Sequence, residues 1–221
     1  MPASAADSAA RYLPERHSLP ALREAAAVCR ACPLWRAGTQ TVFGEGSASA
    51  RVIIVGEQPG NDEDRAGRPF VGPAGKLLHK ALEQAGIAAA DAYVTNVVKH
   101  FKWVPKGKRR LHQKPNAREI RACLPWLEAE LEAVAPELLL CLGATAAQAL
   151  LGREFRVSQQ RGRLFASRFA TQTLATVHPS SILRAPNAED RERELELFVA
   201  DLRVAARALD GRASKRRLAR S

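Results

Sequence analysis

The chain has 221 residues, a net charge of +11 and 46% hydrophobic residues. These totals fit one α/β domain with tails and exclude a chain that is disordered throughout. Residues 211–221 carry five basic side chains and no acid, so the rest of the chain still holds a charge of +6. This excess predicts an anionic partner, most often nucleic acid or an anionic membrane surface.

No apolar run approaches the ~18 residues that a membrane-spanning helix needs, and residues 1–17 lack the basic and apolar parts of a secretory signal. We therefore expect a cytoplasmic protein, associated with the nucleoid and without a membrane partner. Grouped cysteines in that compartment more often bind metal or react than form disulfides. Composition further predicts a flexible N-terminus over 1–17, one domain over 18–210 and a basic, disordered tail over 211–221.

Four short apolar runs, over 51–55, 92–98, 137–142 and 173–177, predict β-strands. Apolar periodicity and cap residues predict helices over 19–28, 73–85, 116–131, 144–151 and 187–209. Residues 99–115 show no helical or strand period, and residues 153–171 are irregular with at most a small hairpin. Strands that alternate with helices predict a three-layer α/β/α fold, in which helices cover both faces of a central four-stranded, mainly parallel sheet.

The long loop after the first strand is a candidate site. Ligands of open α/β sheets bind outside the carboxyl ends of the strands. Glu57 directly follows the strand, and Phe70 is an aromatic residue in a polar loop. The alternative is that the acids of this loop only solvate a surface. The polar residues concerned are Glu57, Gln58, Asp62, Glu63 and Asp64.

The segment after the second strand combines cations and aromatics and has no acid. Cations bind phosphate, and Phe101 and Trp103 offer stacking faces to bases, so the composition favours a nucleic-acid contact over a merely solvated loop. His112 is either an ordinary surface residue or, beside Arg109 and Arg110, a histidine that stays neutral and nucleophilic. The cations are Lys99, Lys102, Lys106, Lys108, Arg109, Arg110 and Lys114.

The fourth strand is followed by His178, Pro179, Ser180 and Ser181, with Arg184 beyond. His178 could donate a hydrogen bond to a developing anion, and Pro179 stiffens the turn. The same residues could instead form only the N-terminal cap of a helix.

The four cysteines form a second candidate group. Cys29 and Cys32 can reach one ion from a single turn, and Cys123 and Cys141 could complete a shell of four thiolates. Cys123 and Cys141 are too far apart in sequence for the second knuckle of a zinc ribbon. Four thiolates from scattered elements suit an iron–sulfur cluster as well as zinc. The alternative is that Cys123 and Cys141 are small buried hydrophobic residues.

Several motifs together resemble one known family, the family-four group of uracil-DNA glycosylases. They are GEQPGNDEDRAGRPFVGPAGKLL, TNVVKHFKW and HPSSILR, with the four cysteines, and the similarity covers roughly residues 29–209. Two features resemble its UdgX branch, which holds uracil-containing DNA in a covalent complex. The family-four group more commonly has Ala at the position of Gln58, and it lacks the segment that residues 107–112 form here.

The resemblance implies a structural [4Fe-4S] cluster on Cys29, Cys32, Cys123 and Cys141. It also implies that uracil is flipped out of the DNA. Phe70 would stack on the flipped base. Asn96 would form hydrogen bonds with the polar edge of uracil. An amide oriented for uracil would leave cytosine with mismatched donors, at a cost of ~1–3 kcal/mol. The expected partner is uracil-containing DNA, single-stranded or double-stranded, with free uracil as the product, and the protein is expected to be a monomer.

The resemblance also implies roles for three catalytic residues. His178 would stabilise the departing uracil anion, Glu57 the oxocarbenium-like sugar, and His112 would attack C1′ and form a covalent adduct. Gln58, Asp64 and Arg110 would support the loop and Glu57. The uracil- or DNA-binding residues implied are Gln58, Asp64, Phe70, Asn96, Lys108, Arg109, Arg110, Ser180 and Arg184.

Three other functions remain open at this point. The protein could be a turning-over family-four glycosylase in which His112 contacts only phosphate, or a non-covalent binder of uracil in DNA. The residues alone also permit a nucleotide-binding α/β enzyme, although Asp62, Glu63 and Asp64 would repel phosphate without a metal.

Overall fold

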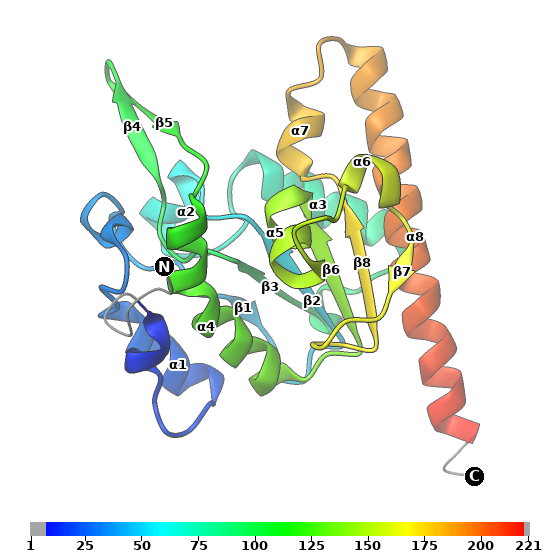
Figure 1. Ribbon diagram of the computed structural model, residues 1–221. Helices are drawn as coiled ribbons and strands as arrows, with labels where there is room; N and C mark the ends of the chain where they lie inside the picture. The colour runs from blue at the N-terminus through cyan, green and yellow to red at the C-terminus, as the bar shows by residue number, and fades with distance from the viewer. Residues whose placement is uncertain (1–7, 219–221) are drawn as a thin grey trace.

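The computed structural model describes residues 8–218. Its centre is a six-stranded sheet in the order β1-β3-β2-β6-β8-β7 (Figure 1). Four strands are parallel to one another: β2 (Val52–Gly56), β3 (Ala92–Asn96), β6 (Leu138–Leu142) and β8 (Gln172–Thr176). The short strands β1 (Glu45–Gly46) and β7 (Leu164–Phe165) pair antiparallel at the two edges. The four predicted strands are therefore confirmed, and the sheet is wider by two short edge strands.

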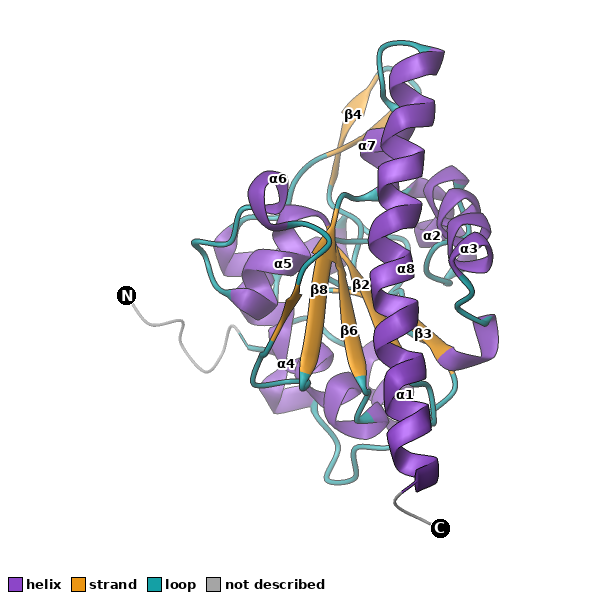
Figure 2. Cartoon of the chain, turned by 90° about the vertical axis from the view of Figure 1, so that its right-hand side faces the viewer, coloured by secondary structure: helices purple, strands orange, loops and turns teal. Residues whose placement is uncertain are grey.

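Helices cover both faces of the sheet (Figures 1 and 2). One face packs on α1 (Leu19–Ala27), α4 (Ala117–Val134) and α5 (Gly143–Leu151), and the other on α3 (Pro73–Ala85), α7 (Pro179–Leu183) and α8 (Ala188–Leu218). Successive side chains of a strand point to opposite faces, so Ile53 and Val55 join the first core while Val52 and Ile54 join the second. The predicted three-layer α/β architecture is confirmed.

Local sequence signals place the helix ends. Asn116 caps α4 by accepting hydrogen bonds from the N–H groups of Arg118 and Glu119, both at 2.9 Å, and Glu119 accepts from the N–H of Asn116 at 2.7 Å. This is the predicted capping box. Gly86 ends α3 in a left-handed conformation (φ 82°), which a residue without Cβ adopts at no steric cost.

Two segments differ from the prediction. Residues 99–115 contain a hairpin of β4 (Trp103–Lys106) and β5 (Arg109–His112), whose backbones pair with each other. Most side chains of both strands are exposed, so the sequence shows no alternation of apolar and polar residues. The loop after β2 contains a short helix, α2 (Asn61–Ala66). The remaining short elements are η2 (Ala9–Tyr12), η3 (Pro33–Arg36), η4 (Ala89–Asp91) and α6 (Val157–Gln160).

The predicted segment boundaries at 17 and 210 remain predictions. Within residues 8–218, η2 lies inside the expected flexible N-terminus, and α8 continues into the expected tail as far as Leu218. Residues 1–7 and 219–221 lie outside the described residues. None of the helices described over 8–218 is long and apolar enough to cross a lipid bilayer.

A buried ion pair joins α4 to the sheet beside the end of β3. Lys99 Nζ contacts a carboxylate oxygen of Glu130, and the two side chains are 1% and 0% exposed. Glu130 also accepts hydrogen bonds from Tyr93 Oη at 2.9 Å, from the Gly44 N–H at 3.0 Å and from Thr95 Oγ1 at 2.9 Å. The Glu130 carboxylate therefore depends on two donors from β3, on the Gly44 N–H and on the Lys99 ammonium.

We expect Lys99→Met to lower the free energy of unfolding by about 3–5 kcal/mol, because it leaves the Glu130 carboxylate buried without its cation. Urea unfolding followed by circular dichroism measures the change. The matched control is Arg68→Met, which breaks the exposed Arg68–Glu45 pair and leaves the unfolding curve nearly unchanged. Equal stability of the two variants would contradict a structural role for the buried pair.

Candidate active site

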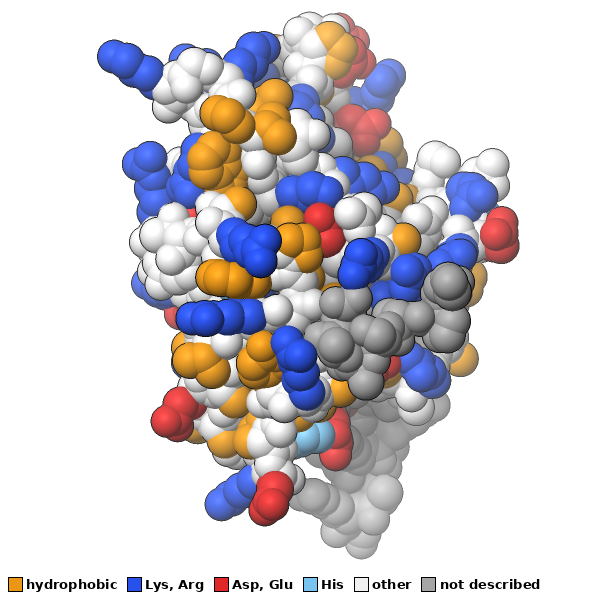
Figure 3. Space-filling model, turned by 60° about the vertical axis from the view of Figure 1, so that its left-hand side comes forward, with side chains coloured by type: hydrophobic (Ala, Val, Ile, Leu, Met, Phe, Trp, Pro, Cys, Tyr) orange, Lys and Arg blue, Asp and Glu red, His pale blue; other side chains and the backbone are white. Residues whose placement is uncertain are grey.

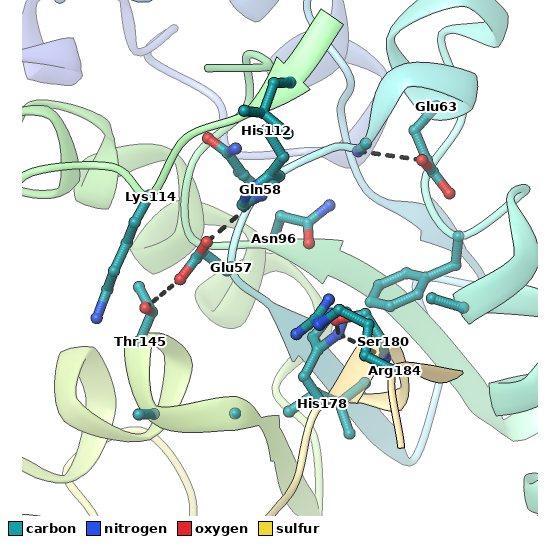
Figure 4. A pocket seen from close by; sticks show the side chains of 17 residues that line it. Glu57, Gln58, Glu63, Asn96, His112, Lys114, Thr145, His178, Ser180 and Arg184 are labelled. Atoms are coloured by element: carbon teal, nitrogen blue, oxygen red, sulfur yellow. Dashed lines mark hydrogen bonds and ion pairs between the residues drawn. The ribbon is translucent and has the colours of Figure 1, made fainter. Parts of the chain in front are cut away.

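A cavity of about 600 Å³ lies at the carboxyl ends of the parallel strands (Figure 4). Glu57 follows β2, Asn96 ends β3, Thr145 lies at the start of α5 after β6, and His178 follows β8. The hairpin of β4 and β5, hereafter the 103–112 hairpin, adds His112 from outside the sheet. The other residues in the lining that the sequence had singled out are Gln58, Glu63, Phe70, Lys114, Ser180 and Arg184.

Phe70 and Asn96, here called the floor of the cavity, line it where both side chains lie against Gly56. A Cβ on Gly56 would lie 2.4 Å from Asn96 Oδ1 and 2.8 Å from Phe70 Cζ, so glycine lets both side chains approach the end of β2. Phe70 is 5% exposed and has a φ of 55°, and Asn96 is 3% exposed. The Asn96 amide has no hydrogen-bond partner among the residues that the structure describes, so it is available to a ligand.

His178 is the cap of α7, and capping fixes its tautomer. Its Nδ1 accepts a hydrogen bond from the Ser180 N–H at 3.1 Å and lies 2.8 Å from Ser180 Oγ. An N–H can only donate, so Nδ1 is unprotonated and the proton of the neutral ring is on Nε2. Burial, helped by the positive charge of Arg184, lowers the pKa of His178 to about 4. The ring is therefore neutral near pH 7 and keeps one Nε2–H donor.

Glu57 lies between two partners. Its Oε2 accepts a hydrogen bond from Thr145 Oγ1, and its Oε1 lies 3.6 Å from His112 Nε2 (Figure 4). The second distance is too long for a hydrogen bond but close enough for electrostatic stabilisation. Burial and Arg184 lower the pKa of His112 below its ordinary value of 6.5, although Glu57 opposes the shift. His112 is thus neutral near pH 7 and faces a carboxylate.

The 103–112 hairpin is held against α2 by Arg110. Its guanidinium contacts Asp64 Oδ2 at 2.6 Å and Asn61 Oδ1 at 2.8 Å, and it stacks 5.4 Å from the ring centres of Phe101 and Trp103. Asp64 is fully buried and also accepts hydrogen bonds from the N–H and hydroxyl of Thr39. Arg110 and Asp64 therefore position the hairpin and do not line the cavity.

Gln58 fastens the base of the same hairpin. Its Nε2 donates to the carbonyl oxygens of Lys102 (3.2 Å) and Gln113 (3.0 Å), and its Oε1 accepts from the Lys102 N–H at 3.2 Å. One side chain thus binds the backbone on both sides of the hairpin. Because residue 58 adjoins Glu57, this contact fixes His112 relative to the acid.

Lys108 and Arg109 lie at the exposed turn of the hairpin, away from the cavity. Lys and Arg side chains outnumber Asp and Glu on the face that carries the hairpin (Figure 3). Val104 and Leu111, which pair across the hairpin, are 42% and 46% exposed between these cations. This composition suits contact with a polyanion that also offers apolar bases.

The cysteines are only partly brought together. Cys29, Cys32 and Cys123 line one small cavity with His100 and Trp126. Cys141 lies in β6 and does not line it, so the prediction of a four-cysteine set is not supported by this arrangement. Burial raises the pKa of Cys123 and of Cys141 to about 12. No group of three or more His, Cys, Asp or Glu that could hold a metal ion is found among the described residues.

Comparison with known proteins decides the family. The Uracil DNA glycosylase superfamily model matches residues 43–203. A Type-4 uracil-DNA glycosylase of Pyrobaculum aerophilum is 36% identical over 178 residues, which cover 77% of this chain and 87% of that protein. A Type-4 uracil-DNA glycosylase of Thermotoga maritima is 38% identical over 169 residues, covering 76% and 84%. The chain belongs to the uracil-DNA glycosylase superfamily. A Type-5 uracil-DNA glycosylase of Thermus thermophilus is 32% identical over 156 residues, covering 56% of this chain and 67% of that protein.

Two residues were missed by sequence reasoning: Thr145 donates a hydrogen bond to Glu57, and His100 lies at the cysteine cavity. Glu63, which the sequence placed at the candidate site, lines the cavity and accepts hydrogen bonds from the N–H groups of Gly60 and Gly72. Thr145 and His100 both follow strand ends, which was the available signal. Asp62, by contrast, is exposed, as expected of a solvating acid.

We expect Arg110→Ala to loosen the hairpin, since a hydrogen bond to a charged group contributes about 1.5–3 kcal/mol. Backbone amides of residues 101–113 should exchange with deuterium about ten- to a hundredfold faster, as measured by mass spectrometry. Arg109→Ala is the matched control, because Arg109 is exposed at the turn. Unchanged exchange in Arg110→Ala would show that the clamp does not hold the hairpin.

Proposed function

We propose that this protein excises uracil from DNA and retains the abasic sugar in a covalent bond to His112, as in the UdgX branch. The observation that carries the proposal is that Glu57, His112 and His178 line a single cavity. The named relatives are uracil-DNA glycosylases, which supports uracil in DNA as the substrate. Free uracil would be the first product.

Recognition of the base would use the floor of the cavity. A base inside a duplex is inaccessible, so the nucleotide is extruded into the site. Phe70 stacks on the pyrimidine, and the unpartnered amide of Asn96 binds its polar edge. The amide can be oriented to match uracil, and cytosine then meets mismatched donors and acceptors.

Bond cleavage would create a negative charge on uracil and a positive charge on the sugar, and one residue would stabilise each. The bond between uracil N1 and C1′ breaks, and its electron pair moves to the base. The Nε2–H of neutral His178 donates a hydrogen bond to the uracil oxygen on which negative charge develops. The Glu57 carboxylate, held by Thr145, stabilises the positive charge on the sugar.

Trapping would use the neutral ring of His112. In its Nδ1–H tautomer, the lone pair of Nε2 forms a bond to C1′, and the ring becomes a cation next to Glu57. Loss of the Nδ1 proton then leaves a neutral alkylated imidazole. The exchange at C1′ balances, because the electron pair of the broken bond leaves with uracil, the lone pair of Nε2 forms the new bond, and solvent takes up the Nδ1 proton.

The features that separate this chain from the common family pattern are physically coupled. Gln58 binds both sides of the hairpin base, and the hairpin carries His112. An alanine at position 58 would not provide these hydrogen bonds. This coupling supports the covalent branch. Lys108, Arg109 and Arg184 would neutralise DNA phosphates, and Ser180 would position His178.

We also propose a [4Fe-4S] cluster held by Cys29, Cys32 and Cys123 with one further ligand. Two observations fit this group. The three thiols share one cavity, and Trp126, which lines it too, has an indole Nε1–H without a partner among the described residues. Cluster ligands surround a body of several atoms and stand farther apart than ligands of a single ion. The cluster would connect α1, the loop after β3 and α4, and its role would be structural.

A turning-over glycosylase is the alternative, favoured by the Type-4 names of the most similar relatives mentioned above. In that case water attacks C1′, and His112 contacts only the DNA. Multiple turnovers of uracil release under excess substrate would support it.

The first prediction for the function concerns His112. We expect the wild-type protein, mixed with a uracil-containing single-stranded oligonucleotide, to give a slowly migrating adduct on a denaturing gel. His112→Ala should lose the adduct and release a free abasic strand. His79→Ala, which changes an exposed histidine on α3, is the control and keeps the adduct. A wild type without adduct would contradict trapping, and a non-covalent binder would also release no uracil.

The second prediction concerns pH. Trapping needs neutral His112, whose pKa is lowered by burial. We therefore expect the single-turnover rate of adduct formation to be constant around pH 8 and to fall roughly tenfold per pH unit once the pH is below the lowered pKa. Gel quantification over a pH series measures it. A midpoint above 6.5 would mean that another group controls the step.

A further inference from the structure

The 103–112 hairpin has two faces, and only one of them holds it to the rest of the protein. Trp103, Arg110 and His112 share the face that contacts the Ala37 carbonyl oxygen, α2 and Glu57. Side chains of directly paired residues lie on the same face of a two-stranded sheet, so Val104 and Leu111 share the other face. Both are exposed. The hairpin thus presents two adjacent apolar side chains, hereafter the apolar pair, to solvent.

The apolar pair borders the opening of the active-site cavity. Leu111 lines that cavity, as does Arg184 directly after α7. The hairpin itself projects beyond the central sheet (Figure 1). A nucleotide extruded into the cavity would leave its neighbours in the DNA at this opening. The bases next to the extruded nucleotide would therefore lie against the apolar pair.

Cations surround the apolar pair. Lys106 and Arg109 follow it in the alternation of the two strands, so they lie on the same face, and Lys108 lies at the turn between them. All three are exposed. Residues 99–115 contain no acidic side chain. Apolar side chains within a ring of cations match DNA, in which apolar base faces lie between phosphates.

The hairpin is not suited to take up a strand from another protein. Pro105 has no N–H group, so β4 lacks a donor that an added strand would need. Exposed cations on a sheet edge also oppose the approach of a further strand. The side chains of this face, and not its backbone, are what the hairpin offers to a partner. Charge complementarity then favours DNA over a peptide strand.

The hairpin is stiff, which suits insertion between bases. Gln58 binds the backbone on both sides of its base, and Arg110 joins its inner face to the buried Asp64. The turn has two residues, and Gly107 adopts a left-handed conformation there (φ 58°). Side chains on a rigid support lose little conformational entropy when they bind. The apolar pair can therefore enter a base stack without first being ordered.

From this arrangement we propose that Val104 and Leu111 insert into the DNA base stack beside the uracil nucleotide and fill the space that it leaves. The inference rests on the proposed function and names a second role for the hairpin that presents His112. Extruding a base from a duplex breaks stacking and pairing, and a single strand resists much less. Apolar side chains that replace the lost stacking offset this cost. The apolar pair thus determines how well the protein acts on duplex DNA.

The test compares uracil release from one oligonucleotide, alone and in a duplex with adenine opposite uracil, under single-turnover conditions. Val104→Thr combined with Leu111→Asn keeps the approximate shape of both side chains and removes their apolar character. We expect the ratio of the duplex rate to the single-strand rate to fall about ten- to a hundredfold. Val104→Ile combined with Leu111→Met should restore the ratio. Leu197→Asn, at an exposed position on α8, is the matched control and keeps it.

Two further readouts separate insertion from a merely structural effect. With guanine opposite uracil the base is easier to extrude, so the deficit of the polar double variant should shrink. With 2-aminopurine next to uracil in the duplex, binding of the wild type should raise the fluorescence, because unstacking relieves quenching, and the polar double variant should raise it much less. Circular dichroism shows that each variant is folded.

An unchanged rate ratio and an unchanged 2-aminopurine signal in the polar double variant would overturn the proposal. The same holds if Leu183→Asn, on α7, loses duplex activity while the hairpin variant keeps it, because the inserted side chain would then belong to α7. A wild type that releases no uracil from either substrate would contradict the proposed function. The 2-aminopurine signal would still decide the present inference, because it reports unstacking and not cleavage.

Discussion

Parallel strands end at the same edge of a sheet, and this constraint assembles the cavity. Glu57, Asn96, Thr145 and His178 follow or end four different strands, yet they meet because β3, β2, β6 and β8 run in one direction. The strands are buried on both faces, so their side chains are committed to packing and the polar chemistry is left to the residues at their ends. The same packing that stabilises the domain therefore positions the reactive groups.

His112 reaches the cavity by a different route. No strand of the central sheet carries it, and the hairpin that does is largely exposed, so packing alone would hold it weakly. The buried carboxylate of Asp64 and the backbone clamp of Gln58 provide the missing constraint. Both clamps originate in the segment that follows β2, which also carries Glu57. The distance between acid and imidazole is thus set within one short stretch of chain and one hairpin.

Burial keeps the His178 imidazole neutral, and partial burial favours the neutral form of His112, whose side chain is 49% exposed. Neutral His178 keeps a hydrogen on the nitrogen that faces away from its capping contact, and neutral His112 keeps a lone pair. One ring is then suited to donate and the other to attack, although both are histidines at the same pocket. Glu57 remains within reach of the second ring and can stabilise the cation that attack would create. The difference arises from hydrogen-bond partners and not from residue type.

The sequence by itself determined the four parallel strands, the cap of α4 and the strand-end residues Glu57 and His178, because apolar runs and cap residues act locally. It also marked the basic segment that carries His112. Only the tertiary structure decided that this segment is a hairpin, since its strands are too exposed to show a hydrophobic period. It likewise separated Cys141 from the other cysteines and placed His100 among them. Spacing along the chain does not encode which buried thiols and which loops meet around one cavity, because that depends on contacts between distant segments.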